Sequence, residues 1–129
     1  MMRLLLDTHA FLWWLGNDPR LSADARAAVA DPANTVLVSA ATAWEITTKY
    51  RLGKLPGAML VAQDVAADVA AEGFLELPIT VAHAQQAGAL QGTHKDPFDR
   101  MLIAQALVEG LALVSNERLF DVYGVTRVW

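Results

Sequence analysis

The fold of this chain is constrained most by its short apolar runs. These runs end in a polar residue and lead directly into helical stretches. Residues 3–6 form such a run ended by Asp7, and residues 35–38 form another ended by Ser39. Runs of this length, rich in Leu and Val, are typical of strands buried in a parallel sheet. Strands that alternate with helices predict an α/β sandwich around a mainly parallel sheet. In such sheets ligands bind beyond the carboxyl ends of the strands, so the polar residues there are the first candidates for a site.

The rest of the chain continues this alternation. Further strands are expected at residues 74–78, 111–114 and 125–128. Helices are expected at residues 9–15, 23–30, 40–52, 59–71, 81–90 and 98–109, the last one ended by Gly110. A length of 129 residues with 54% hydrophobic residues suits a single domain, residues 1–129, with a substantial core.

The composition excludes several classes of protein. Cysteine is absent, which excludes a disulfide scaffold or thiolate metal site and favours a reducing, cytoplasmic location. The apolar runs fall short of the ~20 residues that cross a bilayer, and the first residues lack the apolar length of a signal peptide, so we expect no membrane partner. A net charge of -4 and a pI of 5.2 argue against a sequence-independent nucleic-acid binder, but are compatible with a carboxylate-rich nuclease site.

Two candidate carboxylates in the first half of the chain also have ordinary structural explanations. Asp7 can cap the helix that follows it. Glu45 can form a surface pair with Lys49, one helical turn further on. Because Trp44 and Ile46 flank Glu45, however, this part of the helix is apolar on more than one side, which favours a partly buried acid.

The second half of the chain has its densest cluster of polar residues just before and within the last expected helix. Asp96 precedes Pro97 and is therefore well explained as a helix cap. Asp99 is explained less well, because an acid at the third helical position is optional and this one begins an apolar helix face. Glu117 follows another expected strand, where a solvated turn acid is the usual finding.

Taken together, these acids point to one site. Asp7, Ser115 and Glu117 follow strands, Glu45 lies on the helix that follows a strand, and Asp99 lies at the start of a helix. Carboxylates that share a site repel one another unless a cation lies between them. Oxygen ligands without cysteine favour Mg²⁺, with Mn²⁺ as a substitute, and these ions serve phosphoryl chemistry.

Residues 5–14, 38–46 and 94–106 resemble, in this order, the motifs of a PIN-domain ribonuclease of the VapC type, the toxin of a type II toxin–antitoxin pair. The resemblance covers essentially the whole chain and implies a PIN-like α/β/α sandwich. It maps the first three acids of the family onto Asp7, Glu45 and Asp99, with Asp96 as an accessory acid. The fourth family acid, usually Asp, maps onto Glu117, which follows Ser115 and Asn116.

The resemblance implies an Mg²⁺-dependent endoribonuclease that uses one or two ions and an attacking water. Asp7 and Asp99 would hold the principal ion, Glu45 would ligate or orient water, and Glu117 would complete the site. The implied partners are the RNA substrate, a cognate antitoxin and a second copy of the chain. Two other functions remain open at this point. One is a catalytically weak PIN-like module that binds RNA or protein, and the other is a phosphoacceptor domain, disfavoured because no lysine follows the late strand at residues 111–114.

Several other side chains have a possible role at the edge of the site. The candidate phosphate contacts, which have solvated side chains as their alternative, are Lys49, Arg51, Lys54, Lys95 and Arg100, the last with Asp96 as an alternative partner. His9 and His94 are expected to be structural or to contact phosphate. Of Trp13 and Trp14, one is expected in the core and the other at a partner surface.

Overall fold

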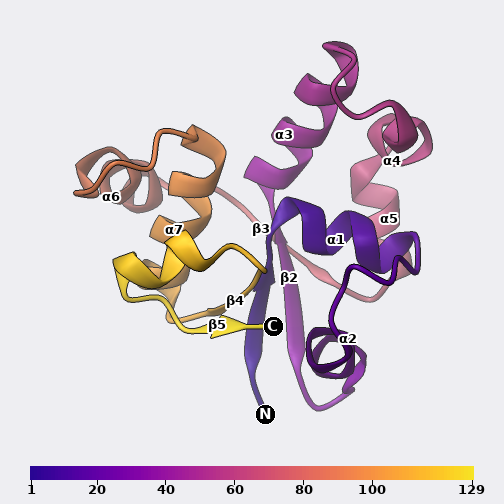
Figure 1. Ribbon diagram of the computed structural model, residues 1–129, viewed down its shortest axis with the longest axis horizontal. Helices are drawn as coiled ribbons and strands as arrows, with labels where there is room; N and C mark the ends of the chain where they lie inside the picture. The colour runs from indigo at the N-terminus through magenta and orange to yellow at the C-terminus, as the bar shows by residue number, and fades with distance from the viewer.

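The computed structural model describes residues 1–129 and contains one five-stranded sheet (Figure 1). The strands are β1 (Arg3–Leu6), β2 (Thr35–Ser39), β3 (Leu75–Leu77), β4 (Ala112–Val114) and β5 (Arg127–Val128). Their order in the sheet is β3-β2-β1-β4-β5, and every neighbouring pair is parallel. The expected α/β class with a parallel central sheet is confirmed.

Helices cover both faces of the sheet. They are α1 (Thr8–Leu15), α2 (Ala23–Ala30), α3 (Ala40–Arg51), α4 (Met59–Gln63), α5 (Val65–Ala71), α6 (Val81–Ala89) and α7 (Pro97–Glu109), with 3-10 turns η1 (Pro56–Ala58) and η2 (Arg118–Tyr123). In Figure 1, α1, α2, α4 and α5 lie to the right of the sheet, whereas α6 and α7 lie to its left. The protein is therefore an α/β/α sandwich.

The side chains of β1 explain why two layers of helices are needed. Leu4 and Leu6 point into one apolar core together with Phe11 of α1, and Leu5 points into the other core together with Leu102 of α7. All of these side chains are fully buried. Burial of one such side chain contributes roughly 1.5–3 kcal/mol, so a strand that is apolar on both faces is stable only between two layers of helices.

Polar residues at the strand ends start the helices. Asp7 follows β1 and accepts a hydrogen bond from the amide of Ala10 (2.7 Å), and Ser39 ends β2 and accepts one from the amide of Ala41 (2.9 Å). These caps satisfy amide groups that have no partner within the helix. The capping explanation of Asp7 is therefore correct, and it fixes the carboxylate at the carboxyl end of the central strand.

The expected helix over residues 59–71 is wrong in one respect, because the chain breaks it into α4 and α5 at Asp64. Asp64 has φ -159° and ψ 80°, and its carboxylate accepts a hydrogen bond from the amide of Ala67 (3.0 Å). An Asp side chain that can cap a new helix competes with continuation of the old one, which hydrophobic periodicity does not reveal. The last three strands are also shorter than expected, and the turns η1 and η2 were not predicted.

The order of the strands places the site. The chain moves outward from β1 through β2 to β3 and then returns to β4 on the other side of β1, so the direction of winding reverses between β1 and β4. Ligands of open α/β sheets bind at this reversal, beyond the carboxyl ends of the strands. None of the helices is long and apolar enough to cross a membrane.

Candidate active site

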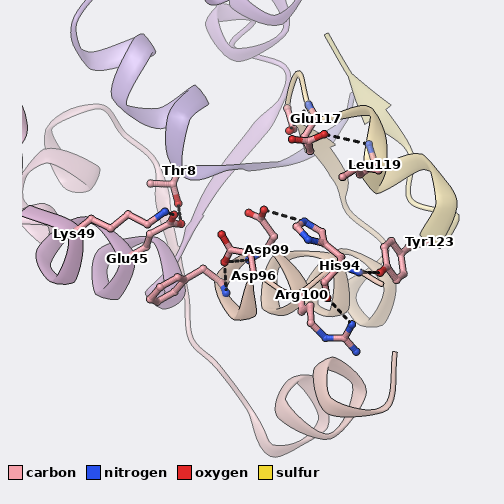
Figure 2. A network of polar contacts seen from close by, with 12 residues as sticks. Thr8, Glu45, Lys49, His94, Asp96, Asp99, Arg100, Glu117, Leu119 and Tyr123 are labelled. Atoms are coloured by element: carbon pink, nitrogen blue, oxygen red, sulfur yellow. Dashed lines mark hydrogen bonds and ion pairs between the residues drawn. The ribbon is translucent and has the colours of Figure 1, made fainter. Parts of the chain in front are cut away.

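A polar pocket lies at the carboxyl ends of β1 and β4. It is lined by Asp7, Thr8, His9, Glu45, Lys49, Asp96, Asp99, Asn116, Glu117 and Phe120. Asp7 and Thr8 follow β1, Asn116 and Glu117 follow β4, and Glu45 comes from α3. Figure 2 shows Glu45, Asp99 and Glu117 around the same space, although they come from three different parts of the chain. The structure therefore brings all the predicted site acids together.

Asp7 lies at the carboxyl end of β1, the central strand of the sheet. Its residue is only 7% exposed, and its amide donates to the carbonyl of Val114 in the adjacent strand (3.1 Å). Burial raises the pKa of the Asp7 carboxyl, and hydrogen bonds from the Ser115 side chain and the Ala10 amide offset part of this effect. The hydrogen bonds thus fix the position of the side chain. Because the carboxylate is buried, its ionised form needs a positive charge nearby to be stable.

Glu45 is buried, with 3% of the residue exposed. The Thr8 hydroxyl donates a hydrogen bond to Glu45 Oε1 (2.6 Å), and Lys49 Nζ forms an ion pair with Glu45 Oε2. Partial burial lowers the pKa of Lys49, but the Glu45 carboxylate outweighs this effect and the pKa is raised. The Glu45–Lys49 pair expected from the helical spacing therefore forms, but inside the pocket instead of on the surface.

Asp99, in the first turn of α7, is partly buried and lies close to several other acids. Desolvation, followed by the negative charges of Asp96, Glu45 and Asp7, raises the pKa of Asp99 to about 7. His94 Nε2 lies 3.0 Å from Asp99 Oδ2, and the His94 ring packs against Phe120. A carboxylate in such surroundings binds a proton or a cation near neutral pH.

The remaining two acids, Asp96 and Glu117, accept hydrogen bonds from backbone amides. Asp96 accepts hydrogen bonds from the amides of Phe98 (2.9 Å) and Asp99 (3.3 Å) and caps α7 as predicted. Glu117 is exposed, and its Oε1 accepts a hydrogen bond from the amide of Leu119 (3.3 Å) at the start of η2. Both side chains therefore border the pocket while they cap the start of a helical segment.

The donor chemistry of the pocket fits a hard divalent cation, because the converging ligands are carboxylate oxygens. No three His, Asp or Glu side chains, however, stand in an arrangement that could hold a metal ion. The contacts of the acids explain this: Glu45 is bonded to Thr8 and Lys49, and Asp99 faces His94. A metal would therefore have to displace internal partners of the acids.

The predicted basic contacts have different positions. Lys49 lines the pocket, whereas Arg100 donates to the backbone carbonyls of Ala87, Leu90 and His94 instead of pairing with Asp96. The exposed side chains of Arg51, Lys54 and Lys95 do not line the pocket. Arg100 thus holds the segment before α7 in place.

Thr8 and Phe120 are two pocket residues that sequence reasoning missed. Thr8 orients Glu45, and Phe120 is a fully buried residue beneath the ring of His94. The position of Thr8 directly after Asp7 was the only available signal, because neither residue type indicates chemistry by itself.

A second, wider groove begins next to the pocket. His9 lines both, and the groove continues along Trp13 of α1 toward Met59 and Leu60 of α4. Trp13 packs against Trp129 and lies under the Arg20 guanidinium. Trp14 turns away from this groove, donates a hydrogen bond to Glu72 (3.1 Å) and packs against Phe74. The two tryptophans thus have different surroundings.

The fold and the pocket thus define a class of protein. It is an α/β/α sandwich with buried acids at the point where the winding of its parallel sheet reverses. A model of the PIN domain matches residues 4–125, and this chain belongs to the PIN domain family. Over 42 residues, 30% of this chain and 30% of the relative, it is 62% identical to "Ribonuclease VapC16" of Mycobacterium tuberculosis. The matched stretch therefore spans less than a third of that protein.

Two solved structures share the fold. One is VapBC2 from Rickettsia felis bound to a DNA fragment from their promoter, with a TM-score of 0.72 and 15% identity over 98% of this chain and 97% of that chain. The other is VapBC-1 from nontypeable Haemophilus influenzae, with a TM-score of 0.66 and 18% identity over 98% and 96% of the two chains. At these identities the likeness concerns the fold alone, and it agrees with the resemblance found in the sequence motifs.

Proposed function

We propose that this protein is an Mg²⁺-dependent endoribonuclease and the toxin of a type II toxin–antitoxin pair. The observation that carries this proposal is the pocket in which burial and neighbouring acids raise the pKa of Asp99 to about 7. Such a site is electrostatically unfavourable until a cation enters. Membership of the PIN domain family and the stretch of similarity to "Ribonuclease VapC16" support the proposed reaction.

In this mechanism Asp7 and Asp99 would hold the principal ion, either Mg²⁺ or Mn²⁺ in its place. When bound, the ion would supply activation of water and stabilisation of negative charge on the phosphate. Capping of α1 keeps the Asp7 carboxylate in one orientation, and Thr8 does the same for Glu45, which would bind the ion or orient the attacking water. Glu117 would act through water, because its carboxylate is exposed and already accepts a backbone hydrogen bond.

The second candidate function is a catalytically weak PIN-like module that only binds RNA or protein. The structure offers one observation in its favour, namely that no ready-made ligand set of three side chains exists. Cleavage of RNA by the purified protein, dependent on Mg²⁺ and stopped by EDTA, distinguishes the two functions. Equal cleavage by metal-free protein would contradict the metal-dependent mechanism.

Addition of Mg²⁺ or Mn²⁺ is expected to raise the melting temperature of the protein. An ion that binds only the folded state stabilises it by RT ln(1 + [L]/Kd), about 2.7 kcal/mol at a hundredfold excess over Kd. In Asp99→Asn this gain should be largely lost, and in Asp96→Asn it should persist, because Asn is also a good helix cap. Differential scanning fluorimetry with and without EDTA measures both gains. Equal loss in the two variants would show that Asp96 is a ligand as well.

We propose that the wide groove along Trp13 receives the antitoxin, and that the protein also forms a homodimer. The groove is bordered by exposed apolar residues of α4, Met59 and Leu60, and it reaches the acidic pocket at His9. An apolar groove that leads to acids suits an extended segment with aromatic or aliphatic anchors and a basic side chain at its end.

Trp13→Ala should weaken binding of the cognate antitoxin, the small DNA-binding protein expected from the adjacent reading frame, by about tenfold or more. Val122→Ala, which removes an exposed apolar side chain elsewhere, is the matched control and should bind normally. Isothermal titration calorimetry measures both affinities. Full affinity of the Trp13 variant would place the antitoxin on another surface.

A further inference from the structure

An apolar cavity lies next to the carboxylate pocket. Its lining includes Trp44 of α3, Ile79 before α6, and Phe98 and Met101 of α7, and six of its nine lining residues are hydrophobic. The first turn of α7 belongs to both spaces, because Asp99 lines the pocket while Phe98 lines the cavity. An apolar space thus adjoins the acids that are proposed to act on phosphate.

Trp44 is unusually exposed for its size. It is 62% exposed, whereas Ala41, Glu45 and Ile46 of the same helix are buried. Its indole meets the ring of Phe98 edge to face, with 4.9 Å between the ring centroids and 76° between the planes. This contact holds the indole in place but leaves most of its surface free, so packing of the fold alone does not account for a tryptophan here.

A cation lies close both to one of the acids and to one ring of this aromatic pair. Lys49 Nζ pairs with Glu45 and lies 6.0 Å from the centroid of the Phe98 ring. In RNA each phosphate is followed, one sugar away, by a base with a flat apolar face. A phosphate near Lys49 would therefore bring a neighbouring base to Trp44. The acids, the cation and the aromatic pair are thus close enough together to contact a cleaved phosphate and its adjoining base.

We propose that Trp44 and Phe98 form a stacking site for an unpaired nucleobase next to the cleaved phosphate of RNA. This inference rests on the proposed ribonuclease function and specifies its substrate class, single-stranded or looped RNA. Unstacked bases are commonly bound on aromatic side chains. Because the Arg100 guanidinium, the charged group of this cavity, is bonded to backbone carbonyls, the site binds the face of the base and tolerates different bases.

The test is binding of a fluorescein-labelled single-stranded RNA, measured by anisotropy with Mg²⁺ present, to protein carrying Asp7→Asn so that no cleavage occurs. Trp44→Ala in this background should raise Kd about tenfold, or about 1.4 kcal/mol. Trp44→Phe should restore most of the affinity because it keeps a stacking ring. Val122→Ala, which removes an exposed apolar side chain outside the cavity, should leave Kd unchanged.

A second arm uses an RNA of the same length with abasic sugars in place of bases. The Trp44→Ala effect on Kd should disappear with this RNA, because no base remains to stack.

Equal Kd values for Trp44→Ala and its parent on normal RNA would overturn the stacking site, while Mg²⁺-dependent cleavage by the wild-type protein would still stand. Conversion of a dimer to a monomer by Trp44→Ala in analytical ultracentrifugation would also overturn it and make this face a contact between two copies. Absence of RNA binding and cleavage by the wild-type protein would overturn both proposals.

Discussion

Asp7→Asn should reduce Mg²⁺-dependent RNA cleavage by roughly 10³-fold, or about 4 kcal/mol of transition-state stabilisation. The substitution removes the negative charge of the acid that follows the central strand but keeps a side-chain oxygen that can accept the hydrogen bond from the Ala10 amide. The fold and the cap of α1 should therefore survive. A quantitative cleavage assay gives the rate, and circular dichroism checks the fold.

The matched control for Asp7→Asn is Glu117→Gln, which makes the same chemical change on an exposed acid of the same pocket. Its rate should fall only about tenfold, which corresponds to about 1.4 kcal/mol. Glu117→Asp should be tolerated. In cells without antitoxin, wild-type protein should arrest growth and Asp7→Asn should not. A folded Asp7→Asn protein that remained toxic would show that binding, not hydrolysis, causes the arrest.

The metal-free protein should lose stability as the pH rises from about 4 to about 8, with Asp99 as a main cause. The pKa of Asp99 is about 7 in the folded protein, against its ordinary value of 3.8. Between these values the folded state therefore binds more protons than the unfolded state, so the contribution of Asp99 is present below pH 4 and is lost as the pH passes 7. The full difference corresponds to roughly 4 kcal/mol, which solvent around this 24% exposed side chain reduces to about 2 kcal/mol.

Asp99→Asn isolates this contribution. In EDTA at pH 8 the variant should be about 2 kcal/mol more stable than the wild type, while at pH 4 the two should be equally stable. Urea unfolding at both pH values measures the free energies, and the comparison removes the effect of groups that titrate equally in both proteins. If the variant were less stable than the wild type at pH 8, the contact with His94 would outweigh the repulsion from the other acids.

Urea unfolding of Asp99→Asn in EDTA and its thermal melting with Mg²⁺ both depend on the repulsion among the pocket acids. Repulsion among Asp7, Glu45 and Asp99 destabilises the metal-free pocket and would at the same time favour entry of a cation. Lys49 supplies part of the missing positive charge. Gain of stability in Asp99→Asn and loss of its response to Mg²⁺ should therefore occur together.

The sequence by itself determined the layers of the fold and most of its helix starts. Leu4, Leu5 and Leu6 place apolar side chains on both faces of a strand, and such a strand requires helices on both sides of the sheet. Asp7 and Asp96 have the side chains that cap helices, and both act as caps. These features depend on neighbouring residues only, which is why pattern and spacing reveal them.

Tertiary structure alone decided the surroundings of the acids. Residue spacing predicted the Glu45–Lys49 pair, but only the packing of α3 placed it inside the pocket, where the Thr8 hydroxyl completes its bonding. Likewise, the pKa of Asp99 depends on burial, on the charge of Asp96 three residues earlier, and on charges from α3 and from the end of β1. Desolvation and the repulsion from Glu45 and Asp7 act through space between residues far apart in the chain, so their strength follows from the folded arrangement, and only the contribution of Asp96 is local in sequence.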